Sequence, residues 1–261
     1  MVRLHRHLRR RLTGWAAASA TAFALASPCL GQDPATIERV KASVVAVGSF
    51  DRLHQPQFSF SGTGFAVADG SLIATNAHII HKLAEGNAKL AIAQRTAQNA
   101  IRVRPARLVR SDASADLALL KIDGQPLPAL VIGNSERVRE GDLYVFTGFP
   151  IGAVLGLSPV THRAMIAAIT PLVIPAGRAN QLNAPAVRRL QTSPFSVFQL
   201  DGTAYPGNSG SPVYDPAGGE VIGIINSVFV KGTKEAALTH PSGITYAIPG
   251  QRLKALLDRA P

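Results

Sequence analysis

Short apolar runs recur along this chain from residue 43 to residue 248, with little helical periodicity between them. Many are rich in valine, isoleucine and phenylalanine, and glycine, proline or an Asp-Gly pair separates them. Such runs are typical of β-strands joined by tight turns, so we expect an all-β fold. The expected strands cover 43–49, 63–68, 72–75, 89–93, 101–109, 117–122, 143–147, 164–174, 196–200, 212–214, 221–229 and 244–248.

Two helical segments are expected at the ends of this strand-rich region. Residues 34–42 form the first, and residues 249–260 form the second, in which Pro249 can occupy the first turn and three leucines share one apolar face. Between the strands, the proline-rich stretch 171–194 predicts a long exposed loop.

The first 31 residues differ in composition from the rest of the chain. They hold five arginines and no acidic residue, and an alanine-rich apolar stretch covers 12–30. This order is typical of a secretory signal peptide, with cleavage expected after Gly31 or Ala26. A membrane anchor is the alternative, but threonine, glycine, serine and proline make the stretch only weakly hydrophobic. We therefore expect residues 1–31 to be a signal peptide, and the exported protein to be periplasmic or secreted without stable membrane insertion.

Removal of that segment lowers the formal net charge from +11 to +6, because it takes away five arginines and no acid. The remaining cations are scattered, and no nucleic-acid motif accompanies them, so we expect no nucleic-acid partner. Cys29 is the only cysteine and lies in the same segment. A mature chain cut after Gly31 therefore has neither a cysteine nucleophile nor a cysteine-bound zinc. The densest cationic cluster comprises Arg102, Arg104, Arg107 and Arg110.

The most specific motif surrounds Ser209 with glycines, in the segment PGNSGSP at 206–212. Glycines on both sides let the backbone fold tightly round an exposed hydroxyl. Such a turn can aim the amides of Gly207 and Ser209 at one point, which is how an oxyanion hole is built. An ordinary glycine- and serine-rich surface loop is the alternative interpretation.

A serine hydroxyl needs a neighbouring base before it becomes a good nucleophile. His78 is the candidate, because it follows the strand-like run 72–75, whose end can present the imidazole to a cleft. A carboxylate should in turn fix the imidazole tautomer, and Asp116 opens the apolar run 117–122. Asp112 is the nearest rival, in a setting typical of a simple turn. The histidines with less suitable context are His54, His81, His162 and His240.

Together these segments resemble the trypsin-like serine peptidases of bacteria, most closely the HtrA/Deg type. The histidine block is GTGFAVADGSLIATNAHII at 62–80, the aspartate block is ADLALLKI at 115–122, and the serine block is FQLDGTAYPGNSGSPVYD at 198–215. Smaller matches at 147–152, 223–226 and 243–249 extend the resemblance over about residues 36–258.

The resemblance implies two six-stranded antiparallel β-barrels, with a short N-terminal helix and a C-terminal helix. They would form one peptidase domain at 32–261, with lobes at roughly 36–140 and 141–250. It also implies that His78 is the general base, Asp116 its orienting partner and Ser209 the nucleophile, with Gly207 and Ser209 as the oxyanion donors. The implied activity is that of an exported serine endopeptidase, which cleaves polypeptides through an acyl-enzyme and requires no metal or cofactor.

Some features depart from the family's pattern or leave it open. Ser211 occupies the position two residues after the nucleophile, where this family commonly has glycine. The serine at this position resembles the motif of glutamyl endopeptidases. No acid lies within 202–208, so we expect no preference for arginine or lysine, because a buried cation would lack its counter-charge. We expect a small or medium apolar residue at the cleavage site. The expected pocket residues are Thr203, Ile225, Asn226 and Ser227.

Two other functional classes compete with the peptidase. A catalytically inactive or latent homologue would keep the fold and bind polypeptides in the cell envelope. An esterase would share the chemistry, but the order His, Asp, Ser and the missing GxSxG motif disfavour an α/β-hydrolase. Because the sequence ends at Pro261, we expect no PDZ domain, and the oligomeric state is left open.

Overall fold

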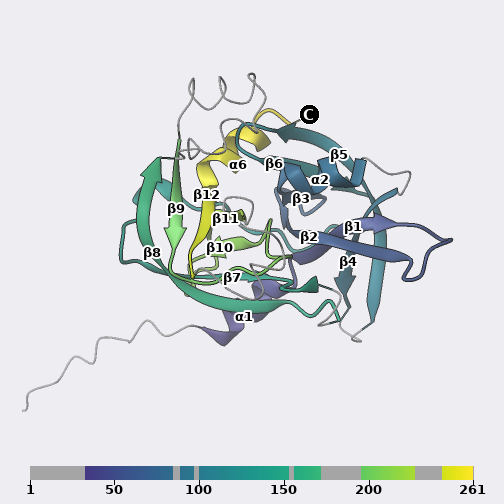
Figure 1. The fold of residues 1–261 in the computed structure, drawn as a ribbon, viewed down its shortest axis with the longest axis horizontal. Helices are drawn as coiled ribbons and strands as arrows, with labels where there is room; N and C mark the ends of the chain where they lie inside the picture. The colour runs from purple at the N-terminus through teal and green to yellow at the C-terminus, as the bar shows by residue number, and fades with distance from the viewer. Residues whose placement is uncertain are drawn as a thin grey trace, which may run out of the picture. The chain divides into compact units, whose positions relative to one another are not determined.

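The computed structural model describes residues 33–84, 89–96, 100–152, 156–171, 195–226 and 243–260. Within these ranges twelve antiparallel strands close into two β-barrels (Figure 1). The first barrel comprises β1 (Val44–Phe50), β2 (Phe58–Val67), β3 (Leu72–Thr75), β4 (Lys89–Arg95), β5 (Ile101–Asp112) and β6 (Leu117–Ile122). The second comprises β7 (Leu143–Gly148), β8 (Val160–Pro171), β9 (Ser196–Leu200), β10 (Pro212–Tyr214), β11 (Val221–Asn226) and β12 (Thr245–Pro249).

The two barrels share one connectivity. Strands follow one another around the first barrel in the order β1-β2-β3-β6-β5-β4, and around the second in the order β7-β8-β9-β12-β11-β10. Closure pairs every strand on both sides, which removes the exposed edges that an open sheet presents. The fold class expected from the sequence, two six-stranded antiparallel barrels, is confirmed.

Apolar side chains fill each barrel and also the region between the barrels. The first interior contains Val45, Ile92 and Leu120, and the second contains Phe146, Ile166 and Leu200. A third cluster draws on both barrels and includes Phe65 and Tyr214. Each large side chain that is fully buried contributes roughly 1.5–3 kcal/mol relative to an exposed one. These three clusters can therefore stabilise the fold without disulfides.

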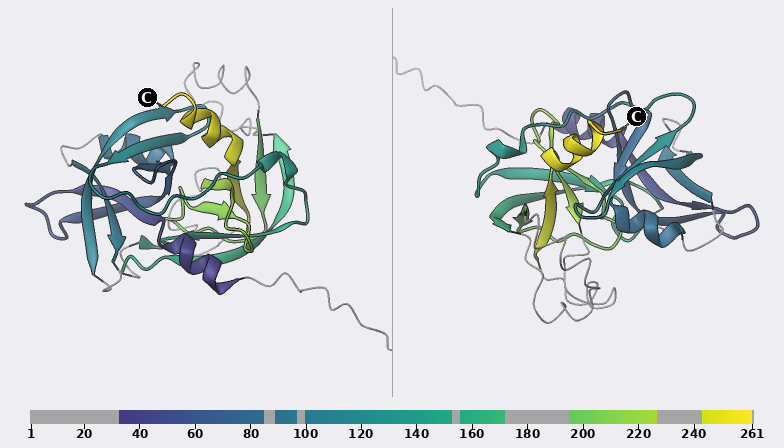
Figure 2. Two further views of the ribbon diagram at one scale, coloured as in Figure 1. Left: turned by 180° about the vertical axis from the view of Figure 1, so that it is seen from behind. Right: turned by 90° about the horizontal axis from the view of Figure 1, so that it is seen from above.

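Three α-helices accompany the strands within the described residues: α1 (Pro34–Lys41), α2 (Ala77–Ala84) and α6 (Gly250–Leu257). Asp33 caps α1 by accepting a hydrogen bond from the amide of Ala35 at 3.0 Å. The C-terminal helix α6 packs against β5 and β6 of the first barrel and β11 and β12 of the second (Figure 2). A short 3₁₀ helix, η1 (Ser135–Arg137), lies on the connection between the barrels.

The observed elements follow the sequence expectations closely, with a few differences. β8 begins at Val160, four residues before the expected strand, and α2 was not expected. The α2 segment is eight residues long, too short to be stable by its own propensity, so a sequence pattern gives little warning of it. None of the helices within the described ranges is long and apolar enough to cross a membrane. The expected signal peptide, and the expected loop beyond residue 171, lie outside the described residues.

Candidate active site

His78 is the second residue of α2, which starts two residues after the end of β3. Its backbone N–H donates a 2.8 Å hydrogen bond to Asp116 Oδ1. A carboxylate at this position offsets the positive end of the helix dipole and satisfies an N–H that the helix leaves unpaired. The helix that carries the imidazole is therefore capped by the acid that also binds the imidazole.

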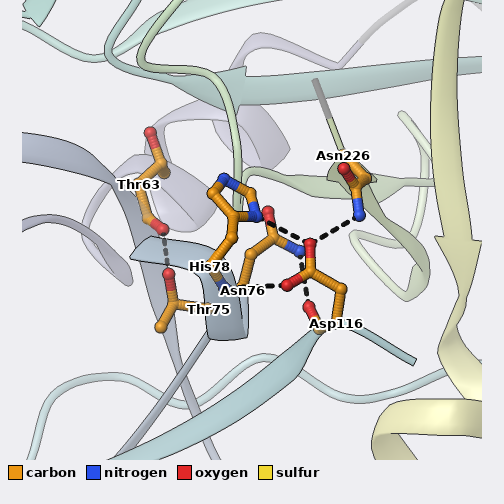
Figure 3. Close-up of polar contacts among 6 residues, drawn as sticks. All are labelled: Thr63, Thr75, Asn76, His78, Asp116 and Asn226. Atoms are coloured by element: carbon orange, nitrogen blue, oxygen red, sulfur yellow. Dashed lines mark hydrogen bonds and ion pairs between the residues drawn. The ribbon is translucent and has the colours of Figure 1, made fainter. Parts of the chain in front are cut away.

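The carboxylate of Asp116 accepts three hydrogen bonds, and two of them end on Oδ2 (Figure 3). His78 Nδ1 lies 2.6 Å from this oxygen, and Asn226 Nδ2 lies 2.7 Å from it. The side chains of His78 and Asp116 are 31% and 18% exposed, so this pair is screened from bulk water only in part. The contact to a carboxylate places the proton of a neutral imidazole on Nδ1 and leaves Nε2 as the basic nitrogen.

The backbone at Asp116 is unusual and is held by two donors. Its φ is +52°, a left-handed conformation that aspartate tolerates better than most residues. The main-chain oxygen of Asp116 accepts hydrogen bonds from Asn76 Nδ2 at 3.0 Å and from Ala77 N at 3.2 Å. The residue that joins β3 to α2 and the first residue of α2 thus fix the main chain that presents the carboxylate.

Ser209 lies on the turn that precedes β10, and its glycine neighbours determine the shape of that turn. Pro206 and Gly207 take the two central positions, closed by a 3.0 Å hydrogen bond from Asn208 N to Tyr205 O. Gly207 has φ +105° and Gly210 has φ +87°, conformations that side chains rarely allow. Proline followed by a residue with positive φ is the pattern of a type II turn.

Each carbonyl from Pro206 to Ser209 accepts a hydrogen bond. Because the peptide group is planar and trans, an N–H points opposite to the C=O of the preceding residue. The amide of Gly207 therefore points away from Ile151, and that of Ser209 points away from Ser211. The donors are Ile151 N to Pro206 O at 2.8 Å, Thr63 Oγ1 to Gly207 O at 2.7 Å, Ser211 N to Asn208 O at 3.0 Å, and Thr63 N to Ser209 O at 2.8 Å.

The residues expected to form the substrate pocket occupy different environments. Ile225 is buried in the second barrel, and Thr203 is half-buried in the segment before the turn. Thr245 fixes that segment, because its hydroxyl donates to Gly202 O at 2.5 Å and accepts from Ala204 N at 2.8 Å. The fully buried Asn226 directs its amide to Asp116, a contact that the sequence does not predict. Ser227 lies outside the described residues.

The other histidines and the rival acid have different surroundings. His81 is exposed, and His54 pairs with Asp51 at 2.8 Å. His162 stacks on Phe146 with ring centroids 4.9 Å apart, and burial lowers the pKa of its imidazole. Within the described residues, no cluster of histidine, cysteine or acidic side chains could hold a metal ion. His240 lies outside these residues.

Asp112 has the local contacts of a turn residue. Its Oδ1 accepts hydrogen bonds from the amides of Ser114 at 2.9 Å and Ala115 at 3.1 Å. These hydrogen bonds fix the bend that leads into Asp116. The Asp112 carboxylate thus bonds its own turn and not an imidazole. The structure thus brings His78 to Asp116 and leaves Asp112 in the turn.

Comparison with known proteins identifies the family of this chain. The sequence matches the trypsin-like peptidase domain family over residues 62–224, a range that includes His78, Asp116 and Ser209. The chain belongs to this family. A solved structure of an HtrA-type protease, AlgW, with a tripeptide has the same fold, with a TM-score of 0.60. The two are 24% identical, and the match covers 85% of this chain and 61% of that one.

Two relatives of this trypsin-like peptidase domain are named as proteases. A Chlamydia pneumoniae protein named "Probable periplasmic serine endoprotease DegP-like" is 31% identical over 206 residues, which is 78% of this chain and 35% of the relative. The mouse protein "Serine protease HTRA4" is 31% identical over 228 residues, which is 86% of this chain and 40% of the relative. The chain thus spans a little over a third of the length of these relatives.

Proposed function

We propose that the protein is an exported serine endopeptidase in which Ser209, His78 and Asp116 act as a catalytic triad. The 2.6 Å contact between His78 Nδ1 and Asp116 Oδ2 carries this proposal. It fixes one tautomer of the imidazole and stabilises the imidazolium that forms when His78 takes a proton. The family, and the relatives named as serine proteases, support the same activity.

The proposed reaction is acyl transfer in two halves. Ser209 Oγ attacks the carbonyl carbon of a peptide bond while His78 Nε2 takes the hydroxyl proton, and the carbonyl oxygen becomes an oxyanion. The amides of Gly207 and Ser209 donate to that oxyanion. His78 then gives the proton to the leaving amine, and the C–N bond breaks. Water attacks the acyl-enzyme by the same route and releases Ser209, so no metal or cofactor takes part.

The substrates proposed are polypeptides with a small or medium apolar residue at the cleavage site. The segment 202–208 contributes no acid that could pair with a buried cation. Thr203, Ile225 and Ser227 would line the pocket. Asn226 would serve Asp116 as well as the pocket, because its amide nitrogen is engaged by the carboxylate.

Covalent labelling with a fluorophosphonate tests this proposal. The wild-type protein should be labelled, with the adduct located at Ser209 by mass spectrometry. Ser209→Ala and His78→Ala should each abolish both labelling and casein hydrolysis, and the double variant should be no worse than either, because the triad acts as a unit. Ser211→Ala changes the other serine of the same motif and should keep the label.

The outcomes separate a peptidase from an inactive homologue. Circular dichroism of each variant should match the wild type, so that any loss of labelling reports on chemistry rather than on folding. A folded wild type that takes no label would contradict the triad and favour a polypeptide-binding homologue. Full activity in Ser209→Ala would show that the nucleophile has been wrongly assigned.

Export is proposed from the first 31 residues, which lie outside the described ranges. We propose that these residues are a signal peptide and that residues 32–261 form the peptidase domain, with lobes at roughly 36–140 and 141–250. Expression in a Gram-negative host should give a periplasmic or secreted protein whose N-terminus, determined by sequencing, is Gln32 or Ser27. Retention of Met1 in the membrane fraction would indicate an anchor instead.

A further inference from the structure

Thr63 is a buried residue of β2 that contacts the nucleophile turn of the other barrel. Its side chain is fully buried, and its hydroxyl donates a 2.7 Å hydrogen bond to Gly207 O. Its backbone N–H donates to Ser209 O at 2.8 Å. One residue of the first barrel therefore binds the carbonyl groups of both residues whose amides form the proposed oxyanion hole.

The hydroxyl of Thr63 has a fixed polarity, because it contacts one acceptor and one donor. Phe149 N–H lies 3.1 Å away and can only donate, so the single hydroxyl proton goes to Gly207 O. Valine has the same shape but neither function, and serine has both without the methyl group. A side chain of the same size without a hydroxyl would therefore lose both hydrogen bonds.

The hydroxyl of Thr63 contacts the peptide group after Gly207 and also the loop that binds the peptide group before it. The C=O that follows Gly207 is bound directly by Thr63 Oγ1. The C=O that precedes it belongs to Pro206 and accepts from Ile151 N, on the loop that Thr63 fixes through Phe149. Thr63 thus contacts Gly207 directly on its carbonyl side and indirectly, through the loop from Phe149 to Ile151, on its N–H side.

The same residue also connects the turn to the strand that leads to His78. Thr75, at the end of β3, donates its hydroxyl proton to Thr63 O at 2.7 Å (Figure 3). Asn76 and Ala77, the next two residues, contact the main-chain oxygen of Asp116. A continuous path of hydrogen bonds thus runs from the nucleophile turn through Thr63 to the segment that carries the base.

We propose that Thr63 is a positioning residue for the oxyanion hole, which its hydroxyl holds in the productive arrangement by binding Gly207 O and Phe149 N at once. The inference rests on the proposed function, because it assumes that Ser209 is the nucleophile. Thr63 itself does not touch the substrate in this proposal. It acts through the direction of the Gly207 amide, which stabilises the transition state more than the bound substrate.

The test compares Thr63→Val, Thr63→Ser and Thr36→Val in the full chain. Thr36 is a matched control, because it is also fully buried and its hydroxyl bonds a main-chain oxygen, that of Ala217, at 2.9 Å, but on α1. Steady-state kinetics on a quenched peptide taken from a casein cleavage site give kcat and KM. Fluorophosphonate labelling rates and thermal unfolding are measured on the same samples.

We expect Thr63→Val to lower kcat about 10- to 100-fold, since removal of a whole oxyanion donor costs about 100- to 1000-fold and here a donor is only misdirected. KM should change by less than about threefold, and the labelling rate should fall with kcat. Thr63→Ser should retain kcat within about threefold. Thr36→Val should lose stability to a similar extent without any change in kcat.

Several results would overturn the inference. Wild-type kcat in Thr63→Val, or an equal loss of kcat in Thr63→Ser, would show that the hydroxyl does not position the hole. If Thr63→Val does not fold, Thr63→Ser still tests the inference, because a loss of kcat in a folded variant that keeps the hydroxyl would contradict it. A wild-type protein that neither labels nor hydrolyses would instead overturn the proposed function, and this inference with it.

Discussion

Replacement of Asn226 by alanine tests whether the Asp116 carboxylate depends on a donor from the second barrel. The amide of Asn226 supplies one of the three hydrogen bonds to that carboxylate, at 2.7 Å, and the residue is fully buried. Hydrogen bonds to charged groups contribute about 1.5–3 kcal/mol. The carboxyl side chain is 18% exposed, so water can replace part of the lost bond. We therefore expect a loss near the lower bound, about 1.5 kcal/mol, or about tenfold in kcat/KM.

Asn226→Asp should be worse than Asn226→Ala at neutral pH. It would place a second carboxylate about where the amide nitrogen now lies, and two adjacent carboxylates cannot both ionise without a large cost. The expected order of kcat/KM is wild type, then alanine, then aspartate. The assay is hydrolysis of a quenched peptide, together with thermal unfolding of each variant.

Asn76→Ala is the matched control for this comparison. Asn76 is equally buried and donates at 3.0 Å, but its acceptor is the neutral main-chain oxygen of Asp116. Hydrogen bonds between neutral groups contribute about 0.5–1.5 kcal/mol, so kcat/KM should fall less than in Asn226→Ala. Wild-type kcat/KM in a folded Asn226→Ala variant, or a higher value for Asn226→Asp, would refute the reasoning.

Two further changes test the surroundings of the turn. Gly148→Ala would place a Cβ 1.9 Å from Ser211 Oγ and 2.9 Å from Thr63 Oγ1, so we expect a destabilisation of about 1–3 kcal/mol and a slower fluorophosphonate reaction; labelling at the wild-type rate would contradict this. Burial lowers the pKa of His162 below 6.5, so the unfolded chain binds this proton more tightly than the native state does. The free energy of unfolding should therefore have its full value above about pH 6.5 and fall at lower pH. His162→Phe should reduce that fall. If the denaturant midpoint of the variant depends on pH as that of the wild type does, His162 is not the cause.

The sequence predicted those features that depend on local pattern. The strands at 72–75, 117–122, 196–200 and 212–214 have the expected bounds, because a run of β-branched and apolar residues between turns is a local signal. Motifs of only a few residues each predict the pairing of His78 with Asp116. The proximity of these two side chains follows from strand pairing, since β3 and β6 are neighbours in the first barrel.

The contacts of Asn226 and Thr63 could not be predicted in the same way. Asn226 is 110 residues from Asp116 in the chain, and Thr63 is 144 residues from Gly207. Such positions meet only when both barrels have closed in the right register and packed against each other. One feature of the sequence does indicate close packing around Thr63, because glycine flanks it on both sides. A Cβ at Gly62 would lie 2.3 Å from Ile79 Cδ1, so glycine there permits the close approach of α2.

The proposed site depends on contacts in both directions between the barrels. Asn226 of the second barrel donates to Asp116 of the first, and Thr63 of the first donates to the turn of the second. The residue before Asn226 also holds the nucleophile turn, since Ile225 O accepts from Gly210 N and Ile225 N donates to Ser211 O, each at 2.9 Å. A shift of β11 by one residue would turn Asn226 to the opposite face and displace the turn. The register of this strand therefore affects a contact of Asp116 and the turn that carries Ser209 together.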